Sequence, residues 1–314
     1  MKLRTVFMGT PDFSSVIASA LEENGFDVVA VVTQPDKEAG RGKKLRPSPV
    51  KEWALQRGID VYQPEKVRNE DFVEILRNIA PDLIVTAAFG QIVPKSILDM
   101  PEYGCVNVHA SILPKYRGAS PIQQSLFDGE KVTGITLQYM DEKIDDGDVI
   151  LINTLQINDD DNCGTLFDRL AELGAKSIAD YAEMLKNGKP IGTPQDHSLA
   201  TYCTKIGKDQ GNIDWCMPAQ SIVNTVRAMS PSPGAYTYLN GKRIKIITAK
   251  VRPCEHNKVF GALIFDKNSL SVACADGFVD IIQLQPEGKS VQQVKDFLNG
   301  NKLQPDMVFE RNID

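Results

Sequence analysis

The amino-acid sequence predicts an α/β fold: a Rossmann-like, doubly wound and mostly parallel sheet, followed by a second, smaller OB-fold-like β-barrel domain. Two observations support this prediction. In the first half of the 314 residues, short β-branched runs alternate with amphipathic stretches, as they do in βαβ units. After residue 205, short strand-like runs follow one another with turns such as Asn240-Gly241 between them, which is typical of a small barrel.

The first domain is expected to span residues 1–188. Its strand candidates are 4–8, 27–33, 83–87 and 104–109. Their nearly continuous apolar runs suit strands that are buried on both faces. Helices are expected at 11–21, where Pro11 suits a first helical position, and at 162–187, where apolar residues recur at helical spacing until Gly188.

The second domain is expected to span residues 205–314. Residues 189–204 lose the helical periodicity and gain Pro190, Gly192 and Pro194, so we interpret them as a linker. Beyond them, the pattern predicts a helix at 218–229, strands at 235–239, 243–249, 261–265, 271–274 and 279–284, and a helix at 290–298.

The composition excludes several classes of protein. The longest unbroken apolar run, residues 28–32, is far shorter than the roughly 18–20 residues that cross a bilayer. A first strand at residue 4 leaves no room for a targeting segment, so we expect a cytoplasmic protein. The six Cys have no metal or CxxC spacing and only three His are present, so we expect reduced thiols and no bound metal.

Charge is distributed unevenly along the chain. Residues 206–314 carry an excess of two basic residues, whereas residues 1–205 carry an excess of eight acidic ones. Residues 36–51 depart from this acidic background, because six Lys or Arg face only two acidic residues there. A solvated loop would explain such a run as well as a nucleic-acid contact would.

The strongest chemical pattern is in residues 104–121. Asn107 and His109 lie two residues apart, so both side chains face the same side at the carboxyl end of a predicted parallel strand, where ligands bind in open α/β sheets. An amide and an imidazole suit acyl transfer, because they can stabilise an oxyanion and handle a proton. Taken alone, this pair is better explained by a capped strand end, and the acidic turn 140–148 is better explained by a solvated hairpin.

Together, these motifs resemble those of the folate-dependent formyltransferases, in particular the members that act on methionyl-tRNA. The resemblance rests on Asn107-x-His109-x-Ser111-x-Leu113-Pro114, followed 36 residues after the histidine by Ile144-Asp145-x-Gly147. Further matching runs lie at 7–13, 34–36, 39–45, 87–92, 117–123, 214–215, 227–228, 284–289 and 296–298.

The resemblance implies a reaction and the residues that perform it. The formyl group of 10-formyltetrahydrofolate passes to the amino group of initiator methionyl-tRNA, with no metal and no obligate protein partner, in a protein expected to be a monomer. Asn107 and His109 would stabilise the oxyanion and Asp145 would help proton transfer. The implied folate-binding residues are Phe89, Gly90, Gln91, Ile92, Ser111, Ile112, Leu113, Pro114 and Asp141.

The resemblance also gives the basic residues a role in binding tRNA. Loop 34–51 would enter the acceptor stem, and the second domain would contact the tRNA backbone. The implied contacts are Arg41, Lys43, Lys44, Arg46, Lys205, Lys208, Lys242 and Arg243. His197 and His256, in contrast, are expected to be ordinary solvated side chains, and Trp215 is expected in the core.

Two positions depart from the family pattern. Lys143 replaces a common Gly, which brings the turn geometry into question because Lys could not adopt a positive φ at little cost. Asp146 replaces a common Thr, and its extra charge beside Asp145 should disfavour ionisation of the pair. Two alternatives stay open: formyl transfer to another amine, such as glycinamide ribonucleotide or an amino sugar, and a noncatalytic protein that binds folate or RNA.

Overall fold

The computed structural model describes residues 2–39 and 44–311. They form two compact units. The first unit comprises the chain up to Pro121, together with Val132–Gln156 and Phe167–Thr204. The second unit comprises Ile122–Lys131, Ile157–Leu166 and the chain from Lys205 onward.

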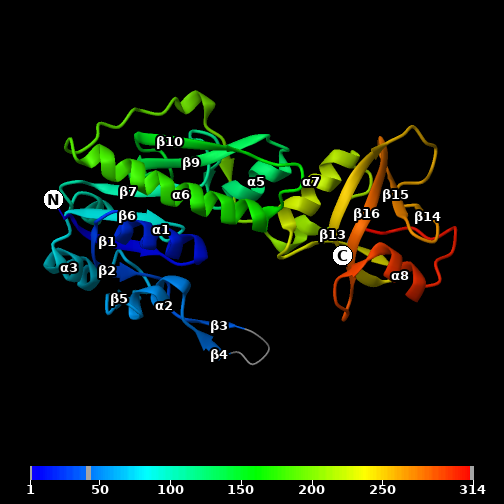
Figure 1. Ribbon diagram of the computed structural model, residues 1–314, viewed down its shortest axis with the longest axis horizontal. Helices are drawn as coiled ribbons and strands as arrows, with labels where there is room; N and C mark the ends of the chain where they lie inside the picture. The colour runs from blue at the N-terminus through cyan, green and yellow to red at the C-terminus, as the bar shows by residue number, and fades with distance from the viewer. Residues whose placement is uncertain (1, 40–43, 312–314) are drawn as a thin grey trace. The chain divides into compact units, whose positions relative to one another are not determined.

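A seven-stranded sheet forms the centre of the first unit (Figure 1). Its strand order is β10-β9-β7-β6-β1-β2-β5. The strands are β1 (Arg4–Gly9), β2 (Asp27–Val32), β5 (Asp60–Tyr62), β6 (Leu83–Ala87), β7 (Cys105–His109), β9 (Val132–Tyr139) and β10 (Val149–Gln156). The five strands from β7 to β5 are parallel, whereas β9 is antiparallel to both of its neighbours. The predicted doubly wound and mostly parallel sheet is therefore confirmed.

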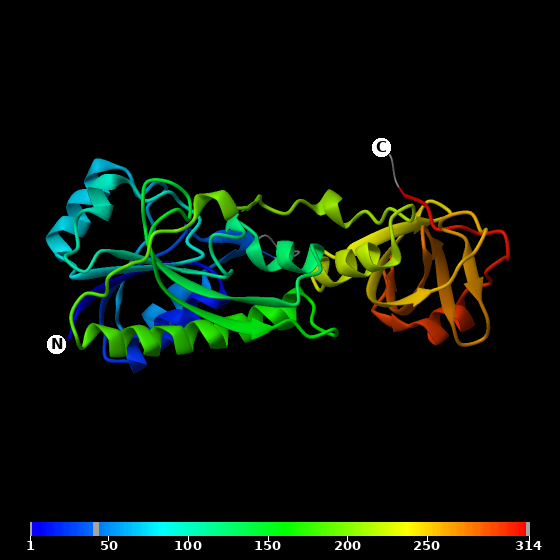
Figure 2. The same cartoon turned by 90° about the horizontal axis from the view of Figure 1, so that it is seen from above.

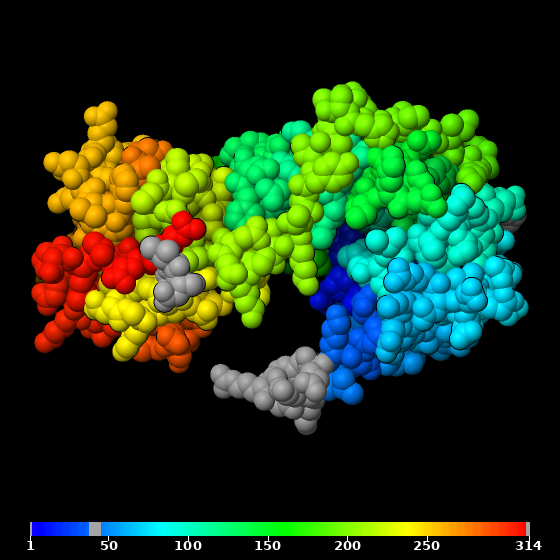
Figure 3. Space-filling model, turned by 180° about the vertical axis from the view of Figure 1, so that it is seen from behind, coloured from blue at the N-terminus to red at the C-terminus, as the bar shows by residue number. Residues whose placement is uncertain are grey.

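Helices cover both faces of this sheet (Figure 2). The helices α1 (Asp12–Glu23), α2 (Pro49–Leu55) and α6 (Cys163–Leu185) lie on one face and α3 (Glu70–Ile79) and α4 (Lys95–Leu98) on the other. On the first face, the rings of Phe13 and Phe167 join α1 to α6 with their centroids 5.8 Å apart. On the second face, Leu76 and Ile97 pack in one buried cluster with Val6. Figure 3 looks onto this second face, where the segment from β5 to α4 is coloured light blue to cyan.

Two short strand pairs complete the first unit. β3 (Lys37–Ala39) pairs with β4 (Lys44–Arg46), and β8 (Arg117–Gly118) pairs in parallel with β11 (Tyr202–Cys203). Segment 189–204, which the sequence suggests is a linker, therefore belongs to the first compact unit. Its Gln195 is only 8% exposed, so this segment contributes to the interior of the unit as well as to its surface.

The second unit contains an antiparallel sheet with the order β12-β13-β16-β15-β14, and β17 pairs with β16. The elements are η2 (Lys208–Gly211), α7 (Ala219–Met229), β12 (Ala235–Leu239), β13 (Lys242–Pro253), β14 (Leu263–Phe265), β15 (Leu270–Cys274), β16 (Gly277–Pro286), β17 (Gln292–Gln293) and α8 (Val294–Gly300). Helix α8 begins four residues later than predicted, because Gln292 and Gln293 extend the sheet. The C-terminal segment bridges both edge regions, since Glu310 pairs with Tyr238 and Val308 pairs with Ala262.

Hydrogen bonds explain why two earlier segments belong to this unit. The segments are Ile122–Lys131, which includes most of α5 (Pro121–Phe127), and Ile157–Leu166, which includes the start of α6. Asn224 of α7 donates from Nδ2 to the Phe127 carbonyl at 3.2 Å. Arg227 of α7 donates from Nε to the Asp161 carbonyl at 2.7 Å and from Nη2 to the Asn158 carbonyl at 2.6 Å. The core of the unit includes Trp215, as predicted, with its indole N–H donating to Thr237 Oγ1 at 3.0 Å. Within 2–39 and 44–311, no helix is both long and apolar enough to cross a membrane.

Candidate active site

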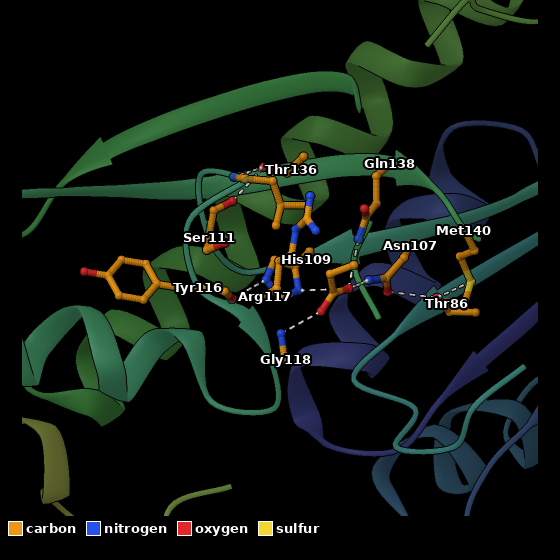
Figure 4. A network of polar contacts seen from close by, with 12 residues as sticks. Thr86, Asn107, His109, Ser111, Tyr116, Arg117, Gly118, Thr136, Gln138 and Met140 are labelled. Atoms are coloured by element: carbon orange, nitrogen blue, oxygen red, sulfur yellow. Dashed lines mark hydrogen bonds and ion pairs between the residues drawn. The ribbon is translucent and has the colours of Figure 1, made fainter. Parts of the chain in front are cut away.

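The carboxyl end of β7 places two of the predicted catalytic side chains. Asn107 is paired in register with Thr86 on β6, and Thr86 Oγ1 donates to Asn107 Oδ1 at 2.8 Å. Because that bond fixes the carbonyl side of the amide, Nδ2 of Asn107 must point the other way, where it donates to Asp145 Oδ1 at 3.1 Å (Figure 4). Among the described residues, the second hydrogen on Asn107 Nδ2 has no protein acceptor, so it is available to a substrate oxygen.

Asp145 lies in the turn that joins β9 to β10. Its backbone is left-handed, with φ of 51°, and its side chain is 12% exposed. Besides Asn107, two groups donate to its carboxylate: Gln138 Nε2 to Oδ1 at 2.9 Å and the Gly118 backbone N–H to Oδ2 at 2.8 Å. Three donors from three different elements therefore fix this carboxylate beside Asn107.

His109 is almost fully buried, and both of its ring nitrogens face protein atoms. Nε2 lies 2.9 Å from the Tyr116 carbonyl oxygen, and Nδ1 lies 3.5 Å from Asp145 Oδ1. A carbonyl oxygen can only accept, so Nε2 carries a hydrogen. The looser Nδ1 contact is therefore the side of the ring that can exchange a proton with Asp145 or with a substrate.

Asp146 points away from Asp145 toward a buried cation. Arg117, which is 1% exposed, pairs with Asp146 through Nη1, and His197 Nδ1 and Lys143 Nζ lie 3.1 and 3.6 Å from the same carboxylate. Burial acts to raise the pKa of Asp146, but the charges of Arg117, His197 and Lys143 outweigh burial and lower it below its ordinary value. The expectation that ionisation of the Asp145–Asp146 pair is disfavoured is therefore wrong for Asp146, because the charge of Asp146 is compensated.

The structure answers the question raised at Lys143 and corrects the expectation for two histidines. Lys143 does not take a positive φ, since the left-handed residue of the turn is Asp145. His197 is 62% exposed but is not simply solvated, because its Nδ1 also lies 3.2 Å from Arg117 Nη2. In the second unit, His256 is likewise bound, with Nε2 lying 2.9 Å from the carbonyl oxygens of Cys274 and Gly277.

Four side chains that support the site were not singled out from the sequence: Thr86, Arg117, Gln138 and Gln195. Thr86 and Gln138 flank Asn107 in the sheet, since Gln138 of β9 is also paired in register with it. The strand pattern could have indicated these two, because polar residues are out of place in strands buried on both faces. Gln195 carried no such signal, because it lies in a segment without periodicity.

The residues implied for folate binding do not all face solvent. Four of them contact other parts of the protein. Phe89 packs in the buried cluster that includes residues of α3, and the Gln91 side chain accepts from the Val67 N–H and donates to the Pro64 carbonyl. Ser111 and Leu113 are buried, and their backbone groups bond to Thr136 Oγ1. The other five, Gly90, Ile92, Ile112, Pro114 and Asp141, have exposed or partly exposed positions. Gly90, with φ of 79°, and Ile92, which is 72% exposed, follow the strand next to β7, so they offer backbone and apolar surface for a flat ring.

The basic residues implied for tRNA binding lie at the surface wherever their side chains are described. Arg46, Lys205, Lys208, Lys242 and Arg243 are all exposed. Arg243 lies with its guanidinium carbon 5.4 Å from the Tyr236 ring centroid. Arg41 and Lys43 lie outside the described residues, and Lys44 is described only as part of β4.

Cys105 is the thiol nearest to Asn107 in sequence. It is 3% exposed, and burial raises its pKa to about 12, so it suits packing rather than nucleophilic attack. In the described part of the chain, no group of three or more His, Cys, Asp or Glu is arranged to hold a metal ion. The side chains that the site brings together are an amide, an imidazole and a carboxylate.

Comparison with known protein families gives the class to which this chain belongs. A sequence model of the formyl transferases matches residues 1–181, and one of the formyl transferase C-terminal domain matches residues 205–302. The chain belongs to the formyl transferase family.

Named relatives narrow this class. The chain is 46% identical to the methionyl-tRNA formyltransferase of Caldanaerobacter subterraneus subsp. tengcongensis over 302 residues, which is 96% of this chain and 98% of that protein. Two solved structures share the fold at 19% identity: the sugar 3N-formyl transferase WlaRD (TM-score 0.67, 92% of this chain and 100% of that one) and a methionyl-tRNA formyltransferase from Clostridium thermocellum (0.55, 80% and 94%).

Proposed function

We propose that this protein transfers the formyl group of 10-formyltetrahydrofolate to the α-amino group of initiator methionyl-tRNA, giving N-formylmethionyl-tRNA for translation initiation and tetrahydrofolate. The convergence of Asn107, His109 and Asp145 at the carboxyl end of β7 carries the chemical part of this proposal. The acceptor is supported by the 46% identity to a methionyl-tRNA formyltransferase over almost the whole of both chains.

The proposed mechanism assigns one task to each of the three side chains. The amine nitrogen attacks the formyl carbon, a carbon–nitrogen bond forms, and negative charge develops on the formyl oxygen. The unpaired N–H of Asn107 stabilises that charge. His109 Nδ1, with Asp145 beside it, accepts the proton that the amine loses, and the positive charge that the ring then carries also stabilises the oxyanion. The proton passes to N10 of the folate as the old carbon–nitrogen bond breaks.

In the same proposal, Gly90 and Ile92 contact the folate ring on one side, and Ile112 and Pro114 bound it on the other. Buried Phe89, Ser111 and Leu113, together with partly buried Gln91, shape the loops that carry these contacts.

The tRNA contacts are proposed on charge and exposure. Lys242 and Arg243 are exposed at a hairpin tip, and Tyr236 beside Arg243 adds an aromatic surface. Lys205, Lys208, Arg46 and the basic residues at 41, 43 and 44 would add phosphate contacts. We further propose that the protein acts as a monomer in the cytoplasm, where aminoacylated tRNA is made and used.

The proposal is tested by incubating the purified protein with 10-formyltetrahydrofolate and one of three acceptors: initiator methionyl-tRNA, glycinamide ribonucleotide or a nucleotide-linked amino sugar. Formylated product is measured by mass spectrometry. We expect product with methionyl-tRNA alone. Turnover with a different acceptor would replace the proposed substrate, and binding of folate or tRNA without any turnover would show a noncatalytic protein.

A further inference from the structure

The amide of Gln195 reaches across to the turn that carries Asp145. Although it lies fifty residues further along the chain, its Nε2 is 3.0 Å from the Asp145 carbonyl oxygen and 2.7 Å from that of Gly147. It also lies 3.2 Å from Gln138 Oε1, on the glutamine that donates to the Asp145 carboxylate. One buried amide group therefore contacts the turn on both sides of Asp146.

This turn needs outside support. Asp145 has a left-handed backbone, a conformation that is unfavourable for a residue with a Cβ atom and persists only where its surroundings enforce it. At Gly147, an added Cβ would come within 1.9 Å of the Tyr139 carbonyl oxygen, so the turn is also tightly packed against the end of β9. Hydrogen bonds to the carbonyl groups of residues 145 and 147 hold the backbone in this conformation.

The orientation of the Gln195 amide is itself determined. Its Oε1 accepts from Arg117 Nη2 at 2.8 Å and from Arg117 Nε at 3.3 Å. Because a guanidinium only donates, the oxygen must face Arg117 and the NH2 group must face the turn. Arg117 is held in turn by Asp146, so the network begins and ends in the same turn.

We infer that Gln195 is a positioning residue for Asp145: its amide, oriented by Arg117, holds the left-handed turn and thereby places the carboxylate beside Asn107 and His109. This inference rests on the proposed function for its catalytic consequence, but its structural content concerns the turn alone. Segment 189–204 is thus part of the catalytic apparatus, although no side chain in it is proposed to touch a substrate.

Gln195→Glu is the sharpest variant. It keeps the size of the side chain and, as a carboxylate, can still accept from Arg117, but it has no hydrogen to donate to the carbonyl groups of Asp145 and Gly147. We expect kcat for formyl transfer to fall about 10²-fold, the effect of a misplaced reacting group, while KM for both substrates stays near the wild-type value. Gln195→Met, neutral and of similar length, should lower kcat in the same way.

Asn153→Ala is the matched control. The Asn153 amide also donates to two acceptors in the first unit, Ser177 Oγ at 3.0 Å and Asp180 Oδ2 at 2.8 Å, but it lies outside the network of Asp145. It should keep the wild-type kcat. A fall in kcat of the same size in the control would show a general effect of lost hydrogen bonds and would overturn the inference.

A second measurement does not depend on activity. The Gly118 backbone N–H donates to Asp145 Oδ2, so its hydrogen exchange reports where the carboxylate lies. Measured without substrates, this amide should exchange faster in Gln195→Glu and Gln195→Met than in the wild type and in Asn153→Ala.

Unchanged Gly118 exchange, or unchanged kcat in both Gln195 variants, would overturn the inference. If the wild type does not formylate methionyl-tRNA, the proposed function fails; faster Gly118 exchange in the variants would then still support the positioning of Asp145. The two ideas can therefore fail separately.

Discussion

The turn at Asp145 and the hairpin tip at Asn240 both contain a residue with a left-handed φ angle but are held by different interactions. The φ angle is 51° at both residues. At the hairpin tip, Asn240 is followed by Gly241 with φ of 71°, and this Asn-Gly pair is the one that favours a tight two-residue turn between strands. Both residues are exposed.

At Asp145 the adjacent residues do not favour the turn in this way. The left-handed position is occupied by an aspartate between Ile144 and Asp146, and the groups that bond to it come from Asn107, Gly118, Gln138 and Gln195. The comparison shows that a local dipeptide is enough for a turn that only connects two strands. A turn that has to place a carboxylate precisely is built from distant parts of the chain.

The largest effect is expected when the carboxylate that the turn positions is itself replaced. Asp145→Asn keeps a residue that tolerates the left-handed conformation, but it cannot accept from all three donors. We expect kcat to fall about 10²- to 10⁴-fold, the usual contribution of a positioned proton-transfer group. Asn240→Asp is the matched change at the hairpin and should leave kcat unchanged. Normal turnover in Asp145→Asn with loss in Asp146→Ala would move the catalytic role to Asp146.

The next effect concerns stability. Arg117→Ala removes the buried partner of Asp146, so the free energy of unfolding should fall by about 3–5 kcal/mol, as is typical when one member of a buried ion pair is lost. Arg243→Ala, at the exposed hairpin, should change it by no more than about 0.5 kcal/mol. Urea unfolding measures both. If both variants lost the same free energy of unfolding, the turn at Asp145 would not depend on buried partners more than the hairpin does.

A smaller effect should be confined to the hairpin. Asn240→Ala places a residue with no polar side chain in the left-handed position, which should lower the free energy of unfolding by about 1 kcal/mol. Asn240→Gly should be nearly neutral, because glycine adopts positive φ freely. Thermal unfolding compares the two variants. If Asn240→Ala matched Asn240→Gly, the hairpin would also depend on tertiary contacts.

The last prediction is a pH dependence. Because the folded protein lowers the pKa of Asp146, this group contributes stability above its unfolded pKa of about 4, and that contribution is lost as the pH falls through the folded value. Asp146→Asn should therefore be less stable than the wild type at neutral pH, and the difference should narrow below about pH 4. Asp60→Asn, which changes an exposed carboxylate, is the control and should show no such narrowing.

The sequence predicted most of the elements of the second unit, but only some of those of the first, where α2, α3 and β5 are among the elements that it did not predict. Strands 83–87 and 235–239 were predicted with their observed bounds, and the long helix at 162–187 is found as Cys163–Leu185. Apolar periodicity and turn residues are local signals, so they predict such elements well. The same locality explains the error at the last helix, where Gln292 and Gln293 join the sheet because β16 is beside them.

The candidate site was predicted only in part. Spacing along a strand placed Asn107 and His109 on one side, and the family motif selected Asp145. The pairing of the Asp146 charge with the buried Arg117 could not be predicted, because a sequence does not show which charged side chains meet in the interior. For the same reason, Phe89 and Ser111 could be assigned to ligand loops although their side chains are buried.

The sequence by itself determined the alternation of strands and helices, the Asn240-Gly241 hairpin and the Asn107–His109 pair, because each depends on residues that are neighbours in the chain. The choice of Asp145 also came from the sequence, through its resemblance to a family motif. Only the tertiary structure decided that Gln195 and Arg117 hold the turn at Asp145. Hydrogen bonds between residues fifty or more positions apart depend on which surfaces pack together, and that packing minimises the free energy of the whole unit rather than of any one segment.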